Sequence, residues 1–194
     1  HYLSVELATG ELTQLTDLPK ASRRTYSGFM RGAVNTFTNE VYFFYDSELR
    51  SLNLASYEVC SLYRHPDGYM PNHVDVSADG KWICTALEQE KEMRSPTLPS
   101  SRNFGFKSYW KSRPHCQVLQ IPAGGGDAKV LHEENCWFSH VNCSPTQPDI
   151  LTFCHEGPWY AVDNRIWGLN RATGEVWPIK KKQGKDFVGH EYWL

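Results

Sequence analysis

The feature that most constrains the fold of this chain is a short pattern that occurs near both of its ends. Residues 2–11 read YLSVELATGE and residues 166–175 read IWGLNRATGE, so each contains a strand-like run, an Ala-Thr-Gly turn and the start of a second run. Residues 49–59 and 116–130 follow the same outline of strand, turn and strand. A unit that recurs in this way predicts a fold built from repeated β-hairpins.

Between these hairpins lie further short runs that are rich in β-branched and aromatic residues. They occupy residues 41–45, 57–63, 73–77, 81–87, 138–143 and 150–155. No segment shows a sustained helical period. Four strands per unit, at a spacing of about 40 to 50 residues, is the signature of a β-propeller blade. We therefore expect an all-β chain forming about three to four blades of a β-propeller, with a β-sandwich of unrelated hairpins as the alternative.

We expect one domain, a partial β-propeller over residues 1–194 that is truncated at both ends. The chain starts at His1 without a Met and stops soon after an aromatic-rich strand begins, so it is interpreted as an internal fragment of a longer protein. Residues 88–113 are polar and charged and contain Pro96, Pro99 and Gly105. This stretch interrupts the repeat, and we expect it to form a loop on one face of the propeller.

Charge and hydropathy exclude two classes of partner. A formal net charge of −2 gives no electrostatic basis for binding nucleic acid. No apolar run approaches the roughly 18 residues that a membrane-spanning helix requires, so no membrane partner is expected. The six cysteines include no CxxC pair, and several lie in apolar strand-like runs, so we expect buried reduced thiols. Such thiols indicate a reducing, cytoplasmic compartment.

Side chains that can carry chemistry concentrate near the C-terminal end. The motif CHEGPW at residues 154–159 precedes DNRIW at residues 163–167, which puts His, Glu, Asp and Arg close together around a Gly-Pro turn. Further histidines lie in SHV at residues 139–141 and in GHEYW at residues 189–193. Ordinary core strands do not need these side chains. Three His-bearing segments between short strands therefore predict loops that meet at one polar site.

These motifs resemble those of the oligogalacturonate lyases, cytoplasmic pectin-degrading enzymes with a seven-bladed β-propeller. The match is close in CHEGP (154–158), VDNRIW (162–167) and HEYW (190–193), and looser in RPHCQV (113–118) and in residues 2–15. The resemblance covers nearly the whole chain, which has about half the family's length. Two departures are WYA after the Gly-Pro and SHV where the family more often has Gly-His-Pro.

The resemblance implies a β-elimination on short, often unsaturated galacturonides. In that reaction a base removes the C5 proton beside the uronate carboxylate, and the C4–O glycosidic bond breaks. The resemblance places the base on His190 and an assisting cation on Arg165. An imidazole titrates near working pH, and a guanidinium can bind a carboxylate through two parallel hydrogen bonds. The alternatives are a structural His190 and an Arg165 that pairs with Asp163 or Glu156.

The family uses a Mn²⁺ ion held by His and Gln side chains. The resemblance places these ligands downstream of Leu194, so Mn²⁺ is expected in the complete protein and no metal ligand in this chain. His155, Glu156 and His140 are expected to bind substrate. The remaining histidines are interpreted as ordinary polar residues of strands or surface: His65, His73, His115 and His132.

The leading interpretation is thus a metal-assisted lyase whose partner is an oligogalacturonide, with this chain alone inactive or nearly so. One alternative is a non-catalytic β-propeller that binds a protein or glycan. A second alternative is a propeller lyase for a different uronate polymer. The first alternative explains the blades, but it does not explain why the His-Glu-Gly-Pro, Arg-Ile-Trp and His-Glu-Tyr-Trp motifs occur together.

Overall fold

The computed structural model describes residues 1–194 except 20–31, 92–101, 163, 185, 187 and 190. The described residues form one two-stranded sheet and three four-stranded sheets, all antiparallel. The two-stranded sheet, or N-terminal hairpin, pairs β1 (Leu3–Val5) with β2 (Leu12–Gln14). The first blade comprises β3 (Ala33–Asn35), β4 (Glu40–Tyr45), β5 (Glu48–Asn53) and β6 (Val59–Arg64).

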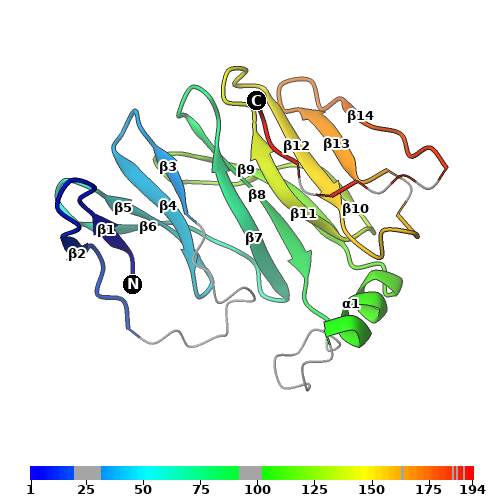
Figure 1. The fold of residues 1–194 in the computed structure, drawn as a ribbon, viewed down its shortest axis with the longest axis horizontal. Helices are drawn as coiled ribbons and strands as arrows, with labels where there is room; N and C mark the ends of the chain where they lie inside the picture. Colours follow the sequence, from blue (N-terminus) through cyan, green and yellow to red (C-terminus); the bar gives the residue numbers. More distant parts are fainter. Residues whose placement is uncertain (20–31, 92–101, 163, 185, 187, 190) are drawn as a thin grey trace.

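The other two sheets follow the same plan. The second blade comprises β7 (Tyr69–Val76), β8 (Trp82–Gln89), β9 (Cys116–Pro122) and β10 (Lys129–Glu134). The third blade comprises β11 (Phe138–Cys143), β12 (Ile150–His155), β13 (Ile166–Asn170) and β14 (Val176–Pro178). Each blade runs through its strands in sequence order, and β3, β7 and β11 lie next to one another (Figure 1). This radial set of four-stranded sheets is that of a β-propeller, which confirms the expected fold class.

The repeated sequence at the two chain ends forms the same turn. The N–H of Gly10 donates to the carbonyl of Glu6 at 2.7 Å, and the N–H of Gly174 donates to the carbonyl of Asn170 at 2.8 Å. Both glycines have positive φ, 75° and 76°, a conformation that disfavours side chains with a Cβ. The N-terminal hairpin therefore corresponds to β13–β14 of the third blade.

The core lies between the faces of adjacent sheets. Fully buried side chains between the first two blades include Tyr42, Leu49, Ile83 and Ile121. Those between the second and third blades include Val118, Phe138, Leu151 and Phe153. Each such side chain contributes about 1.5–3 kcal/mol of hydrophobic stabilisation. Burial on both faces explains the nearly continuous apolar runs of β4, β8 and β12, because neither side of these strands faces water.

The stretch at residues 88–113 differs from the expected loop. Residues 102–111 form the helix α1 (Arg102–Lys111), and β8 continues to Gln89. The helix is held by Tyr109, which is fully buried and donates its hydroxyl to the carbonyl of Gln89 at 2.8 Å. Its ring meets Trp137 edge-on at 5.0 Å. The helix has no long apolar stripe, and so hydrophobic periodicity did not reveal it; residues 92–101 lie outside the described part.

The cysteines, one short strand and the helices also bear on the sequence-based expectations. Five of the six cysteines are buried free thiols and Cys60 is exposed, which agrees with reduced cysteines in strands. The short strand β3 was not expected, because its three residues carry no pattern of their own. Among the helices of the described part, none has the length and apolar character that crossing a membrane would require.

Candidate functional site

The site begins at a β-bulge in β11. The pairing of β11 with β12 shifts register between Ser139 and Asn142, and His140 has a positive φ of 52°. Consecutive side chains of a regular strand point to opposite faces. The bulge removes that alternation, so Ser139 and His140 both reach the same carboxylate, that of Glu156. A strained non-glycine residue at this point indicates a position that the surrounding structure must hold in place.

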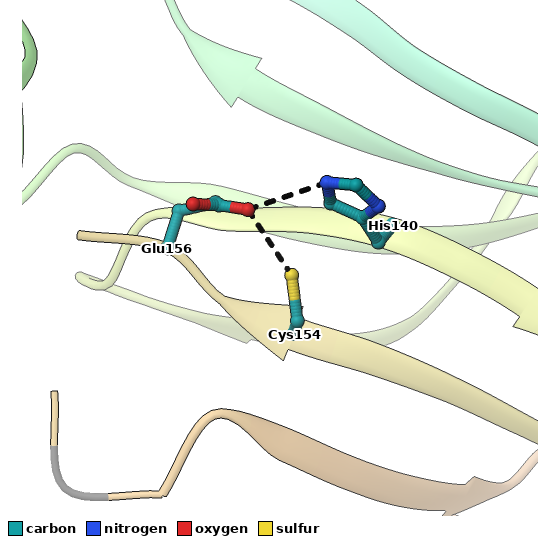
Figure 2. Close-up of side chains that lie close together, drawn as sticks. All are labelled: His140, Cys154 and Glu156. Carbon is teal, nitrogen blue, oxygen red and sulfur yellow. Dashed lines mark hydrogen bonds and ion pairs between the residues drawn. The ribbon is translucent and has the colours of Figure 1, made fainter. Parts of the chain in front are cut away.

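Glu156 is the centre of the cluster. Its Oε1 accepts hydrogen bonds from Ser139 Oγ and Arg165 Nη2, each at 2.8 Å. His140 Nε2 lies 3.3 Å and Cys154 Sγ 3.5 Å from the same oxygen (Figure 2). Burial raises the pKa of Glu156, but the hydrogen bonds from His140, Arg165 and Ser139 and the charge of Arg165 outweigh it and hold the pKa well below its usual range. Glu156 is therefore a buried, ionised acceptor.

The backbone around Glu156 is tightly packed. The N–H of Glu156 donates to the carbonyl of Trp137 at 2.8 Å. The next residue, Gly157, has φ 148°, and a Cβ there would lie 2.4 Å from Cδ1 of Trp110 in α1. The glycine of the CHEGP motif thus lets the indole of α1 approach the end of β12. The helix packs beside the site for this reason (Figure 1).

Arg165 lies directly before β13 and is only 7% exposed. Nη2 donates to Glu156 at 2.8 Å and Nε donates to the carbonyl of Gly189 at 3.2 Å. Nη1 is buried and has no hydrogen-bond partner among the residues that the structure describes. Burial lowers the pKa of Arg165, but the hydrogen bond and charge of Glu156 raise it above its usual value, so the guanidinium stays charged. Arg165 thus forms an ion pair with Glu156, while Asp163 lies outside the described residues.

Arg165 also lines a small pocket. The other lining residues are Trp159, Val162, Lys182, Asp186 and Val188. Lys182 Nζ donates to the carbonyls of Trp159 at 3.3 Å, Tyr160 at 3.1 Å and Val162 at 3.4 Å. These bonds hold the loop after the Gly-Pro turn against the pocket. Two cations, Arg165 and Lys182, therefore lie at this pocket together with one anion, Asp186.

The C-terminal tail crosses this cluster. Gly189 accepts from Arg165, and Trp193 Nε1 donates to the carbonyl of Asn142 in β11 at 3.2 Å. Between these two anchors lies Glu191, whose carboxylate oxygens are both buried without a hydrogen-bond partner among the described residues. Sequence reasoning did not single out Glu191, although the HEYW motif contains it. His190, the expected base, lies outside the described residues, so its role stays a prediction.

His155 is adjacent to Glu156 in sequence but lies in a different network. Its Nε2 lies 2.9 Å from Oε1 of Glu134 on β10, and its ring stacks on Phe138 at 5.4 Å. Oε1 of Glu134 also lies 3.3 Å from Nε2 of His132. Hydrogen bonds from His132 and His155 lower the pKa of Glu134 to about 2. The structure therefore brings His140 together with Glu156 and Arg165, while His155 joins the contact between the second and third blades.

The second blade contains a related arrangement. Asn72, in the string NHVDVS, donates to the buried carboxylate of Glu88, as Ser139 in SHVNCS donates to Glu156. His73 lies at a bulge like that of His140, and the two rings are 4.8 Å apart. Sequence reasoning missed this pair. The similarity of the two six-residue strings, at residues 72–77 and 139–144, was the signal that could have found it.

One group of side chains has the spacing of metal ligands. The ligand atoms of His140, Cys154 and Glu156 all lie within 4.8 Å of one another. Manganese favours oxygen and imidazole ligands, whereas a thiol favours softer metals. Burial and the nearby Glu156 raise the pKa of the Cys154 thiol well above its usual value. The carboxylate of Glu156 is already ion-paired with Arg165, a permanent cation. This donor set does not fit Mn²⁺.

Comparison with known proteins gives one consistent result. The family model described as oligogalacturonate lyase matches residues 1–194. An oligogalacturonate lyase of Dickeya dadantii (strain 3937) is 26% identical over 197 residues, which is 100% of this chain and 48% of that protein. An oligogalacturonide lyase of Pectobacterium atrosepticum is 25% identical, with the same coverage of 100% and 48%. The chain spans about half the length of the curated relatives it matches.

A solved structure supports the fold. An oligogalacturonate lyase in complex with manganese superimposes with a TM-score of 0.82 at 22% identity. The match covers 99% of this chain and 49% of that one. At this identity the likeness establishes the arrangement of the blades and no more.

Proposed function

The chain belongs to the oligogalacturonate lyase family, and from this premise we propose that the protein carrying it cleaves oligogalacturonides by β-elimination. The observation that carries the proposal is Arg165, a buried guanidinium that lines a pocket and has one N–H group without a partner among the described residues. Glu156 already balances the charge of Arg165, but the buried Nη1 still needs an acceptor, which a carboxylate oxygen can supply. Each uronate sugar of an oligogalacturonide carries one carboxylate.

The chemistry explains why such a cation is needed. The C5 proton of a uronate is weakly acidic, because its removal spreads negative charge onto a carboxylate that is already charged. The barrier falls if a fixed positive group faces the carboxylate as that charge grows. In this proposal Arg165 is that group, and Glu156 with the carbonyl of Gly189 fixes the plane of its guanidinium. His190 is proposed as the base that removes the proton.

The contacts of Glu156 refine the expected substrate-binding residues. Oε1 of Glu156 already accepts from Ser139 and Arg165, so we assign Glu156 to positioning Arg165 and not to holding a sugar. His140 is partly exposed beside the same carboxylate and stays a proposed substrate contact. His155 is engaged with Glu134, so direct contact with the sugar is a weaker proposal for it than for His140.

The whole protein is proposed to bind Mn²⁺ through residues outside this chain. The structure of an oligogalacturonate lyase in complex with manganese supports the metal, and the poor fit of the Cys154-containing cluster supports a location elsewhere. Residues 1–194 are proposed to form part of a single propeller domain. Five buried free thiols support the cytoplasm as the compartment.

The test is turnover of saturated digalacturonate by the purified full-length protein with Mn²⁺. Formation of the unsaturated uronate is followed by its ultraviolet absorbance and by chromatography. We expect His190→Ala to lower kcat by about 100- to 10,000-fold, as the loss of a general base does. An inactive wild-type protein that still binds a glycan or a protein would favour the non-catalytic alternative. An active His190→Ala variant would show that the base is another residue.

A further inference from the structure

Two buried groups beside the ionised Glu156 lack partners, and they differ in kind. Arg165 Nη1 is a donor without an acceptor, and Glu191 has two oxygens without a hydrogen bond, among the residues that the structure describes. A buried polar group without a partner destabilises the fold, because it has lost its hydrogen bonds to water and gained none in return. Two such groups in one place indicate a site that a third group completes. This inference rests on the proposed function and concerns how the site holds its substrate.

The tail brings Glu191 near the arginine, close enough for the two charges to interact. The carbonyl of Gly189 accepts from Arg165 Nε, and the indole of Trp193 donates to Asn142 O on β11. Glu191 lies between these two anchors, in the segment that runs beside β11 (Figure 1). Its carboxyl group is close enough to His140, Arg165 and Glu156 for their charges to act on it. The charges around Glu191 decide whether its carboxyl group is protonated or ionised.

Four charged or titratable groups lie close enough to Glu191 for their charges to act with it. Arg165 and His140 favour its charged form, while Glu156 and the buried Cys154 lie nearby on the end of β12. Glu156 accepts one hydrogen bond from Arg165 Nη2 and is the ionic partner that the guanidinium already has. Burial and the charge of Glu156 raise the pKa of Glu191, although the charges of His140 and Arg165 oppose the rise. A second anion placed here raises that pKa further.

We propose that Glu191, as a neutral carboxylic acid, and Nη1 of Arg165 together bind the carboxylate of a uronate. The acid donates its O–H to one carboxylate oxygen, and Nη1 donates to the carboxylate as well. No proton is transferred between the enzyme and the carboxylate in this step. Both hydrogen bonds strengthen as negative charge accumulates on the carboxylate during removal of the C5 proton, so the pair stabilises the transition state more than the bound substrate.

This arrangement explains why a glutamate sits beside a positively charged site without an ion pair of its own. An ionised Glu191 would repel the substrate carboxylate and compete with it for Arg165. A protonated Glu191 adds a donor and leaves Nη1 available. The same logic makes the clamp selective, because a neutral sugar offers no acceptor of comparable strength.

The decisive variants are Glu191→Gln and Glu191→Ala in the full-length protein. A glutamine is neutral, has nearly the same shape and donates through its amide, so it replaces a protonated glutamate but not an ionised one. Binding is measured by NMR titration with D-galacturonate, which has no glycosidic bond to cleave, and with D-galactose for comparison. Glu133→Gln, an exposed glutamate on β10, is the matched control.

We expect Glu191→Ala to weaken galacturonate binding by about tenfold or more and Glu191→Gln to stay within about threefold of wild type. Galactose binding should be unchanged in both, and the control should match wild type. Thermal unfolding of each variant shows whether the fold survives. In turnover of digalacturonate, Glu191→Ala should lower kcat more than it raises KM.

The proposal is overturned if Glu191→Gln is as impaired as Glu191→Ala, because an ionised carboxylate or a structural role would then explain the loss. It is equally overturned if both variants bind like wild type, or if wild type does not bind galacturonate. A wild-type protein that binds galacturonate but does not cleave digalacturonate would contradict the proposed function and leave the clamp standing.

Discussion

The second and third blades carry nearly the same polar arrangement, but only the third combines it with an arginine. In the second blade Asn72 donates to the buried Glu88, and in the third Ser139 donates to the buried Glu156. The residue after each donor is a histidine at a bulge, and the two rings lie 4.8 Å apart. The repeat therefore supplies a buried glutamate and a histidine twice.

The difference lies in the third strand of each blade. In the second blade Ala86 pairs with Val118, and the corresponding pair in the third blade is Cys154 with Ile166. The residue before Val118 is Gln117, and the residue before Ile166 is Arg165. Gln117 therefore occupies the position in the second blade that Arg165 occupies in the third. Gln117 donates to Glu133 on the outer strand at 2.8 Å, away from Glu88. The comparison teaches that two blades with a shared frame can differ in charge through a single strand position, here a glutamine or an arginine beside the buried glutamate. Among the described residues, the C-terminal tail bonds to the copy that has the arginine.

The most direct way to break this comparison is Arg165→Gln, which gives the third blade the residue of the second. Loss of a preorganised cation at a developing negative charge should lower kcat/KM for digalacturonate by about 100- to 1,000-fold. Arg165→Lys should be nearly as impaired, because lysine keeps the charge but loses the planar fork. Gln117→Ala is the matched control and should keep its activity. Near-normal kinetics for Arg165→Lys would return Arg165 to a purely structural role.

The fold was more accessible from the sequence than the site was. The blades could be predicted because each hairpin carries its turn residues, such as Gly10 and Gly174, within a few positions of its strands in the sequence. Arg165 could be singled out because it lies in a motif of the family, and its role stays a prediction. Glu191 was missed because its importance comes from a tail that returns to β11, a contact of long sequence separation. The helix α1 was missed because one buried tyrosine, and no periodic stripe, fixes it.

A second way to sharpen the comparison is to remove each buried glutamate separately. Glu156→Gln leaves Arg165 buried without an ionic partner, and breaking a buried pair costs about 3 kcal/mol or more. Glu88 has Gln117 at the position where Glu156 has Arg165, so Glu88→Gln leaves no buried cation unpaired there. We therefore expect it to lower the free energy of unfolding by only about 1–2 kcal/mol. Urea unfolding of both variants measures the difference in the free energy of unfolding. Equal losses would mean that the arginine does not distinguish the two blades energetically.

The contact between the two blades should respond to acid. His132 and His155 lower the pKa of Glu134 to about 2 in the folded protein, below its ordinary value of 4.5. A depressed carboxyl pKa adds stability that is present above the unfolded value and is lost as pH falls from about 5 towards 2. Because Glu134 is partly exposed, we expect about 1 kcal/mol after screening by solvent. Glu134→Gln should flatten this part of the pH profile of the melting temperature, whereas Glu133→Gln should leave it unchanged.

The smallest effect concerns the turn that the first and third blades share. Tyr57 has φ 62° and donates its N–H to the carbonyl of Asn53 at 2.9 Å, as Gly174 with φ 76° donates to Asn170. A tyrosine in this left-handed conformation is strained, and its side chain is exposed, so it gains little from packing. Tyr57→Gly should therefore stabilise the fold by about 0.5–1 kcal/mol, measured by urea unfolding.

Gly174→Ala is the reciprocal change and should destabilise the third blade by about 1 kcal/mol, since a Cβ there meets the same backbone strain. Space is not the cause, because no atom lies within 4 Å of the added Cβ in the described structure. If Tyr57→Gly lowers stability instead, the tyrosine ring makes a contact that offsets the strain. In that case the two turns are alike in hydrogen bonding but not in energy, and the repeat would be less regular than its sequence indicates.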